Sequence, residues 1–493
     1  MTIKPLQSTN RVALARVRED DFGVIPSNPA FKQIRQTSSG IAANPNTVIS
    51  AEIRPDRQVT DLILVGQQAG GPIGGEIAFG VADDDFEEAL QGTWSAGPSI
   101  SDDAAGAWTL SDGALTVPAG GAAFAPGVIV LLSGFPTATN NRIATVVSAT
   151  ATVITFAAGT FTPETAPIPV GASVRVVGFE TAAGDVAAVA TGDNALTSTL
   201  LDFTTLGLVP GMWLWVGDGD NAGHALASAS GTVRIVSVAA HRLTLDRVPA
   251  GWADDAGTGI ALRVFVGDFL RNASVMRSNT IERQYLDHSP VTYEYMRGMT
   301  LNTMEVTANA QAIATYTKTY LGRDAYMPDP MARVAGATDV PAPTFGVLNT
   351  SSNVGRIGFD GATIAGPNFV MAATININNN LRAQNAVGSI GAVGIGNGEF
   401  TVTGSLNTYF GDKSIYVKII DNMRTSFDLR VGRKDGNRES MLLDFPTIKL
   451  SSGSPSVSGK NADVMIQAGF TAYMDPTLGY TMSVTRFWYL PSA

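Results

Sequence analysis

Two segments of the chain alternate strictly between apolar and polar residues. In residues 399–406 the two sides are Phe400, Val402 and Leu406 against Glu399, Thr401, Thr403 and Ser405. Residues 73–81 alternate in the same way, and each segment precedes a short helical pattern, at residues 86–90 and 415–420. A period of two indicates a strand with one buried face and one wetted face. We therefore predict a mostly β protein with two short helices.

The chain is long enough for several such sheets. Its 493 residues predict three or four domains. There is no Cys, so disulfides and thiol chemistry are excluded. The longest apolar run, residues 128–132, is far shorter than the ~18 residues that cross a bilayer, and residues 1–11 lack the apolar core of a signal peptide. We expect a soluble protein made without a secretion signal and without membrane contact.

Charge separates one segment from the rest of the chain. Residues 95–268 contain 14 acidic residues, six Arg and no Lys, a net charge of −8 out of −10 for the whole chain. Such a shift in composition predicts that this segment, called the insert below, is a separate folding unit. No cluster of Lys and Arg occurs, so the pattern disfavours a protein that binds nucleic acid tightly.

The insert contains an internal repeat. Pro126-Gly127 before residues 128–134 parallels Pro210-Gly211 before residues 212–217. Residues 146–156 likewise parallel 235–245, and residues 174–178 parallel 262–267. Short strands at regular spacing with Gly and Pro between them are typical of small barrels. We predict two small β-barrel-like units, at about 108–180 and 205–268.

A looser repeat spans the rest of the chain. The alternating strand and short helix at residues 73–90 resemble those at 400–420, and residues 50–57 resemble 374–382. Residues 297–306 then resemble 444–450, and another alternating strand follows in each case, at 313–320 and 464–472. Because the elements recur in the same order, we interpret the chain as a duplication whose first copy is interrupted by the insert.

Motifs of catalysis and ligand binding are missing. The three His residues, at 224, 241 and 288, stand in unrelated contexts, and no P-loop or HExxH occurs. The glycine cluster at 394–398 precedes a strand and is best read as a turn, and residues 218–223 start like a calcium loop but lack its closing Glu. Asp83, Asp84 and Asp85 are expected to cap the helix that follows. We predict no enzyme, no catalytic residue, no metal site and no cofactor.

A series of short motifs covers most of the chain outside the insert. In the first part these are Arg11-Val-Ala-Leu-Ala-Arg16, Glu19, Phe22-Gly23, Pro26, Ser50-Ala-Glu-Ile-Arg54 and Asp56-Arg57. Later ones are Ile281-Glu-Arg-Gln284, Tyr293-Glu-Tyr-Met-Arg-Gly298, Asn379-Asn-Leu-Arg382, Tyr409-Phe410, Gly459-Lys-Asn-Ala-Asp-Val464, Phe470-Thr-Ala472 and Asp475. Together they resemble the tail tube (major tail) proteins of long-tailed bacteriophages of the siphophage type. The unit that ends at Gly267 also resembles a small domain often found in that family, whereas the unit at about 108–180 departs from the family pattern.

The resemblance implies a structural virion protein built from β-sandwich domains, each with a short helix. Residues 1–94 and 269–335 would form a first, discontinuous tube domain with an N-terminal arm, and residues 336–493 a second. The insert would be an external decoration. Stacked rings of such subunits would make the tail tube, the conduit for genome DNA during ejection.

The wetted side of the alternating strands would then face a water-filled bore. Glu76, Glu399, Thr401 and Thr403 are the candidate lumen-facing residues. A neutral-to-acidic lining would let double-stranded DNA pass without capture, because Lys and Arg are the side chains that bind phosphate. DNA would be a non-specific partner in transit only.

Ring stoichiometry follows from the duplication. Tubes of the family that this chain resembles are usually six-fold, so two tube domains per chain predict a trimer with pseudo-six-fold symmetry. A true hexamer, in which one half builds the wall and the other decorates it, is the alternative. The resemblance further implies contacts with tape measure, tail terminator and distal tail proteins, assembly in the host cytoplasm and a final place in the virion tail.

Another class of function stays open at this stage. A tail fibre or adhesin would bind carbohydrate through the small barrels, and exposed Trp213, Trp215 and Trp252 would favour it. A polysaccharide hydrolase would need paired carboxylates in a groove, which residue patterns alone do not exclude.

Overall fold

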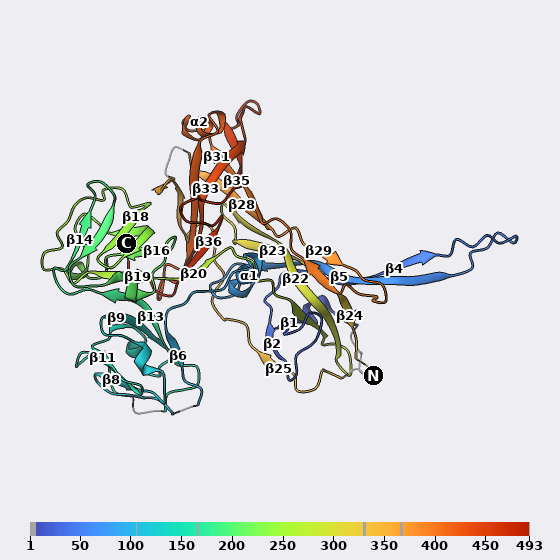
Figure 1. Ribbon diagram of the computed structural model, residues 1–493, viewed down its shortest axis with the longest axis horizontal. Coiled ribbons are helices and arrows are strands. Elements are labelled where there is room, and N and C mark those ends of the chain that lie inside the picture. Colours follow the sequence, from blue (N-terminus) through green and yellow to red (C-terminus); the bar gives the residue numbers. More distant parts are fainter. Residues whose placement is uncertain (1–5, 105, 165–166, 329–331, 365–367, 493) are drawn as a thin grey trace.

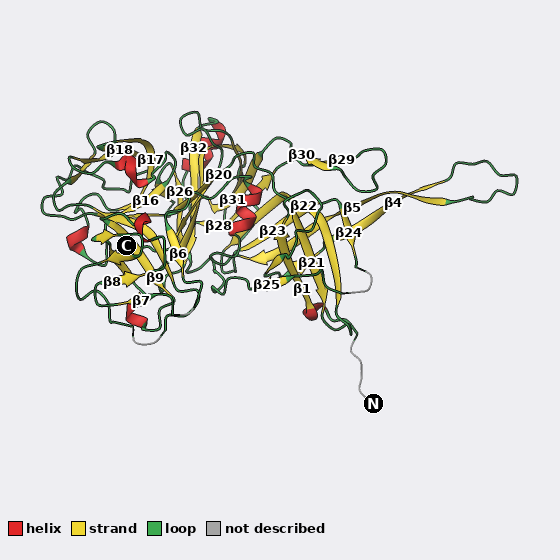
Figure 2. Cartoon of the chain, turned by 60° about the horizontal axis from the view of Figure 1, so that its bottom comes forward, coloured by secondary structure: helices red, strands yellow, loops and turns green. Residues whose placement is uncertain are grey.

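The computed structural model describes residues 6–104, 106–164, 167–328, 332–364 and 368–492. The fold is mostly β, as predicted, with two short α-helices, α1 (Asp83–Ala89) and α2 (Ser414–Ile420). Figure 1 shows an elongated molecule: the insert lies at one end, a twisted β-hairpin projects from the other, and sheets fill the middle. Figure 2 shows the same arrangement by secondary structure. In the described part of the chain, no helix is long and apolar enough to cross a membrane.

One continuous antiparallel sheet, called the long sheet below, organises the middle of the molecule. Its strands pair in the order β5–β23–β22–β28–β31–β35–β33. They are β5 (Leu62–Glu76), β23 (Thr315–Leu321), β22 (Thr292–Asn309), β28 (Val370–Asn378), β31 (Thr401–Tyr409), β35 (Met465–Ala472) and β33 (Ser440–Ser452). The strands β3 (Ser38–Ser39) and β4 (Ala42–Ile49) continue it beyond β5, and β34 (Pro455–Ser456) pairs with β35.

Two smaller groups of strands branch from the long sheet. One pairs with the N-terminal part of β22 and consists of β1 (Val12–Arg18), β2 (Ala30–Gln33), β21 (Asn279–Tyr285), β24 (Asp324–Tyr326) and β25 (Thr338–Val340). The other pairs with β33 and consists of β20 (Asp268–Arg271), β26 (Val354–Phe359), β27 (Ala362–Thr363), β32 (Arg424–Gly432) and β36 (Ser483–Phe487). A single apolar core runs behind the long sheet and includes residues of both helices.

The same strand order occurs twice in the long sheet. The first half of the sheet has the order β5–β23–β22, and the second half repeats it as β31–β35–β33. The two halves meet where β22 pairs with β28. The registers also match. Gly75 lies opposite Tyr316 and under its ring, and Gly404 lies opposite Phe470 and under its ring. These glycines leave room for the aromatic side chains of the neighbouring strand.

The two glycines predict different responses to substitution. A Cβ at Gly75 would lie 2.7 Å from Cζ of Tyr316, and the nearest atoms all belong to that ring. A Cβ at Gly404 would meet the ring of Phe470 and also the carbonyl oxygen of Thr374, which is backbone. Alanine at either position should cost about 1–3 kcal/mol by overpacking. Double-mutant cycles measured by thermal unfolding test this difference. Tyr316→Leu should relieve most of the destabilisation caused by Gly75→Ala, whereas Phe470→Leu should relieve little of the destabilisation caused by Gly404→Ala. Equal coupling at both pairs would contradict this account.

Three details differ from the sequence-based expectations. The strand expected at 73–81 ends at Glu76: Ala78 forms only an isolated bridge with Val347, and the chain turns at Gly80, whose φ of 75° is left-handed. Residues 50–57 lie at the tip of the hairpin, so they do not correspond to 374–382; residues 37–40 take the place of the end of β28. Asp83, Asp84 and Asp85 lie in the first turn of α1 and do not cap it, since they pair instead with Arg and Lys side chains.

The chain enters and leaves the insert at one place, where Ser95 and Phe269 exchange two backbone hydrogen bonds of 2.8 and 2.9 Å. One sheet runs through the insert in the order β10–β9–β13–β19–β16–β17–β18–β15–β14, and β6 also pairs with β13. The order is symmetric about the β13–β19 pair: β9 lies on the outer side of β13, and β16 lies on the outer side of β19.

The strands of that sheet are β6 (Ser99–Ser101), β9 (Val128–Ser133), β10 (Ile143–Thr145), β13 (Ser173–Glu180), β14 (Val186–Val189), β15 (Ala195–Ser198), β16 (Trp213–Val216), β17 (Gly231–Ala239), β18 (Arg242–Asp246) and β19 (Arg263–Val266). A second sheet contains β7 (Thr109–Leu110), β8 (Ala114–Thr116), β11 (Ser148–Ala149) and β12 (Val153–Thr155). Two apolar cores lie largely within the insert, and one of them also includes Phe269, Leu478 and Tyr480. A third core joins it to Leu442, Phe487 and Leu490 of the second half.

Candidate channel-lining face

The long sheet has one apolar face and one polar face. Its apolar face packs into the main core through residues such as Ile73, Val306 and Phe470. The opposite side, called the polar face below, carries mainly Thr, Ser, Asn and Gln. Its side chains form rows across the strands because the registers are aligned. The central row runs through Thr317, Glu305, Asn376, Thr403, Thr471 and Lys449.

Three of the four candidate residues lie on this face. Thr401 and Thr403 belong to β31 and stand opposite Asn378 and Asn376 of β28. Glu76 is the last residue of β5, opposite Thr315 of β23. Glu399 lies two residues before β31, is exposed, and accepts a hydrogen bond of 2.8 Å at its backbone oxygen from Asn380 Nδ2. The sheet therefore groups Glu76 with Thr401 and Thr403, whereas Glu399 stands at its border.

Other members of the polar face were not singled out from the sequence. Glu305 lies near the centre of the sheet, where Asn376 Nδ2 donates a hydrogen bond of 3.3 Å to its Oε2. Lys449 closes the central row at the far edge. A signal for them exists in the alternation of Thr303, Glu305 and Thr307 and of Thr374, Asn376 and Asn378. Their alignment with Thr403 depends on pairing between distant strands, which the alternation does not contain.

The apolar face also holds a buried group of charges. Lys318 Nζ donates two hydrogen bonds of 2.8 Å to the carboxylate of Asp85, and Arg16 donates one of 2.5 Å to the same carboxylate. Burial raises the pKa of Asp85, but the charges of Arg16 and Lys318 outweigh it and lower the pKa to about 2. This cluster ties α1 and β1 to β23, so it fixes the back of the long sheet.

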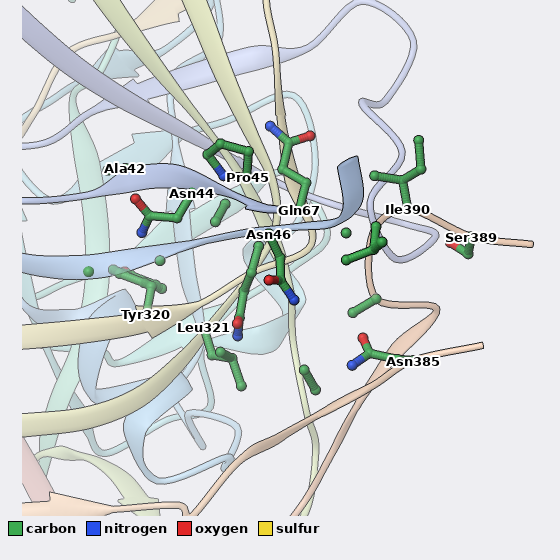
Figure 3. A pocket seen from close by; sticks show the side chains of 18 of the residues that line it. Ala42, Asn44, Pro45, Asn46, Gln67, Tyr320, Leu321, Asn385, Ser389 and Ile390 are labelled. Carbon is green, nitrogen blue, oxygen red and sulfur yellow. The ribbon is translucent and has the colours of Figure 1, made fainter. Parts of the chain in front are cut away.

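The structure offers little for other kinds of chemistry. A cavity of about 670 Å³ lies between the base of the hairpin and residues 383–392 (Figure 3), and its lining contains no Asp, Glu, Lys, Arg or His. Among the described residues, no group of three His, Asp or Glu could hold a metal ion. Trp213 and Trp215 are buried, and Trp252 Nε1 donates to the carbonyl of Val189 at 3.0 Å. The first two therefore present no face to a sugar.

Comparison with known families identifies the kind of protein to which this face belongs. A family model described as phage tail tube protein matches residues 9–472, nearly the whole chain and both halves of the long sheet. The chain belongs to the phage tail tube protein family. Members of this family are structural proteins of the virion tail that assemble into a tube, which agrees with the resemblance found in the sequence. No curated protein matches this tail tube chain.

Proposed function

We propose that this protein forms stacked rings of the tail tube and that the polar face lines the channel through which genome DNA is ejected. The observation that carries the proposal is the long sheet, with an apolar side turned to the core and a polar side turned to solvent. Such a two-sided sheet is suited to the wall of a water-filled barrel. Heterologous stacking of rings extends without closing and produces a tube.

The two ends of the long sheet support closure between copies. At one end, residues 37–40 and β4 pair on one side only, with β5. At the other end, the last residues of β33, from Leu450 to Ser452, pair with β35 and lie beyond the last pairing with β32, at Lys449. Unpaired strand edges expose backbone donors and acceptors and tend to pair with another chain. Pairing of one end with the other end of the next copy would remove both edges.

A trimer fits the duplicated sheet. In this proposal residues 1–94 and 269–335 form the first tube domain, and residues 336–493 the second. Each half contributes four strands, counting β3 and β4 as one, so that three chains give a barrel of 24 strands with pseudo-six-fold symmetry. Residues 95–268 decorate the outside. Tape measure, tail terminator and distal tail proteins are the proposed partners, and assembly takes place in the host cytoplasm.

The polar face suits the passage of DNA. Among its described residues, charge is carried by Glu76, Glu305 and Lys449, with Glu399 at the border. Isolated charges of mixed sign make no continuous track for phosphates, whose capture by Lys and Arg depends on many simultaneous contacts.

Imaging along the tube axis tests the proposal. Purified protein examined by electron microscopy should form rings or tubes with a wall of six similar domains and three outer protrusions. Six identical protrusions per ring would replace the trimer by the hexamer. A compact monomer at high concentration, absent from assembled tails, would overturn the proposed function altogether.

A further inference from the structure

The hairpin that projects from the molecule is apolar in the outer part of its paired strands. This hairpin, called the arm below, consists of β4, the part of β5 up to Gly70, and the turn between them, and Figures 1 and 2 show its outer part extending beyond the other strands. Four consecutive residues of β5 are exposed apolar side chains: Leu62, Ile63, Leu64 and Val65. On β4, Val48 pairs with Ile63 and Ile49 with Leu62, and both are exposed as well.

A consecutive apolar run is unusual for a solvent-exposed ribbon. Because neighbouring residues of a strand point to opposite faces, Leu62 to Val65 make both faces of the arm apolar. Strands of this composition are normally buried on both sides. An isolated two-stranded hairpin is also marginally stable in water. The arm is therefore expected to be covered by protein in the assembled state.

The chain contains a shorter counterpart of the arm that is already docked. The register that equates Gly75 with Gly404 equates the arm with the hairpin of β29 (Arg382–Gln384) and β30 (Gly394–Gly396), which belongs to the second half. This shorter hairpin lies on the first half. The Gln67 N–H donates a hydrogen bond of 2.8 Å to the carbonyl of Ile390, and Gly391 lies against Arg323. Tyr320 and Ile390 line the cavity between them (Figure 3).

The way in which the shorter hairpin docks on the first half predicts where the arm docks on the next copy. In a closed ring, the first half of one copy adjoins the second half of the neighbouring copy. This contact repeats the one that joins the second half to the first half within a single chain. The position equivalent to Tyr320 is then Met474, two residues beyond the end of β35. Met474 is 61% exposed, and Tyr473 beside it is also exposed, as are Val387 and Val393 of the shorter hairpin. These side chains form an apolar surface on the second half.

We propose that the arm of each copy packs against the surface formed by Met474, Tyr473 and the β29–β30 hairpin of the neighbouring copy in the same ring. This inference rests on the ring of the proposed function and names the surface that joins its subunits. In this register Ile63 corresponds to Ala392 of the shorter hairpin, which lines the same cavity as Tyr320. Ile63 and Met474 of adjacent copies are accordingly the side chains that should meet.

Disulfide trapping tests this contact, and the chain contains no Cys to interfere. The variant Ile63→Cys with Met474→Cys is assembled, oxidised and analysed by non-reducing electrophoresis. Within one chain, β23, β22, β28 and β31 separate β5, which carries Ile63, from β35, a distance of roughly 24 Å at about 4.8 Å per strand. A disulfide needs Cα atoms within about 7 Å, so an intrachain bond does not form.

The covalent product is expected to end at the number of chains in one ring, which is three for the trimer. Val48→Cys with Met474→Cys, which moves the thiol to the paired strand, should give the same product. The control pair Ile63→Cys with Leu200→Cys, exposed on the insert, should stay monomeric on the gel.

The possible outcomes distinguish failure of the proposed contact from failure of the proposed ring. Rings or tubes that form without cross-linking of either cysteine pair would overturn the docking surface and leave the proposed function standing. A ladder that continues past the chains of one ring would place the arm on another ring and overturn the same-ring contact. Absence of any ring by electron microscopy, for the unmodified protein too, would overturn the proposed function.

Discussion

Arg234→Met is expected to destabilise the folded protein by about 3–5 kcal/mol, because it leaves the carboxylate of Asp444 buried without its cation. Arg234 lies in β17 of the insert and Asp444 in β33, and each side chain is about 1% exposed. Arg234 Nη1 donates hydrogen bonds of 3.0 and 3.1 Å to the Asp444 carboxylate, and Nη2 donates one of 2.6 Å to Asp246. Urea unfolding followed by circular dichroism at neutral pH measures the loss.

The electrostatics of Asp444 explain why the loss is large. Burial raises the pKa of Asp444 to about 6, even though the charge of Arg234 lowers it. Without Arg234, burial raises the pKa of Asp444 with no opposing effect from that cation. Arg234→Met combined with Asp444→Leu removes both charges and should therefore be more stable than the single variant.

A matched control exists on the same interface. Arg438 forms an ion pair of 3.0 Å with Asp220 of the insert, but these side chains are 32% and 41% exposed. Arg438→Met should cost under about 1 kcal/mol, because water screens this pair. Equal costs for Arg234→Met and Arg438→Met would refute the assignment of Arg234 as the buried link between the insert and the long sheet.

Lysines placed on the polar face are expected to slow DNA ejection while the tubes still assemble. Glu305→Lys with Thr403→Lys adds two cations to the central row of every chain, and stacked rings repeat them along the whole channel. Each cation adds a phosphate contact, so the rate of DNA release from variant virions should fall by about an order of magnitude or more at low salt and recover at high salt. Both positions are exposed, so stability should change by under about 0.5 kcal/mol each.

The control for this experiment carries its lysine outside the channel. Thr204→Lys lies on an exposed turn of the insert and should leave ejection unchanged at every salt concentration. If ejection from the Glu305→Lys, Thr403→Lys virions is as fast as from unmodified virions at low salt, with both lysines verified by mass spectrometry, the polar face does not line the channel.

Local patterns predicted much of the fold. The alternation at 399–406 anticipated β31 and its wetted residues Thr401 and Thr403, and the helical spacings anticipated α1 and α2. These features depend on neighbouring residues alone, which is why they could be read directly. The family resemblance rested on short motifs and was confirmed by the match over residues 9–472.

Long-range pairing was beyond such patterns. That Glu305, Asn376 and Thr403 form one row depends on the register of β22, β28 and β31, strands that are dozens of residues apart. The acidic run at 83–85 looked like a helix cap because its partners, Arg16, Lys318 and Arg486, come from remote strands. Burial of Trp213 and Trp215 likewise follows from a core that the insert shares with the C-terminal segment.

The strand β22 acts mechanically as a lever. Its 18 residues pair with β21 and β24 in the N-terminal part and with β23 and β28 in the C-terminal part, so one strand belongs to two groups of strands. At about 3.3 Å per residue it is roughly 60 Å long, and a rotation of 1° about one end moves the other by about 1 Å. A register shift between Leu301 and Thr303, where the second group begins, sets its bend. A tilt of the long sheet is therefore passed through β22 to β21 and β1, which pair beside its N-terminal part.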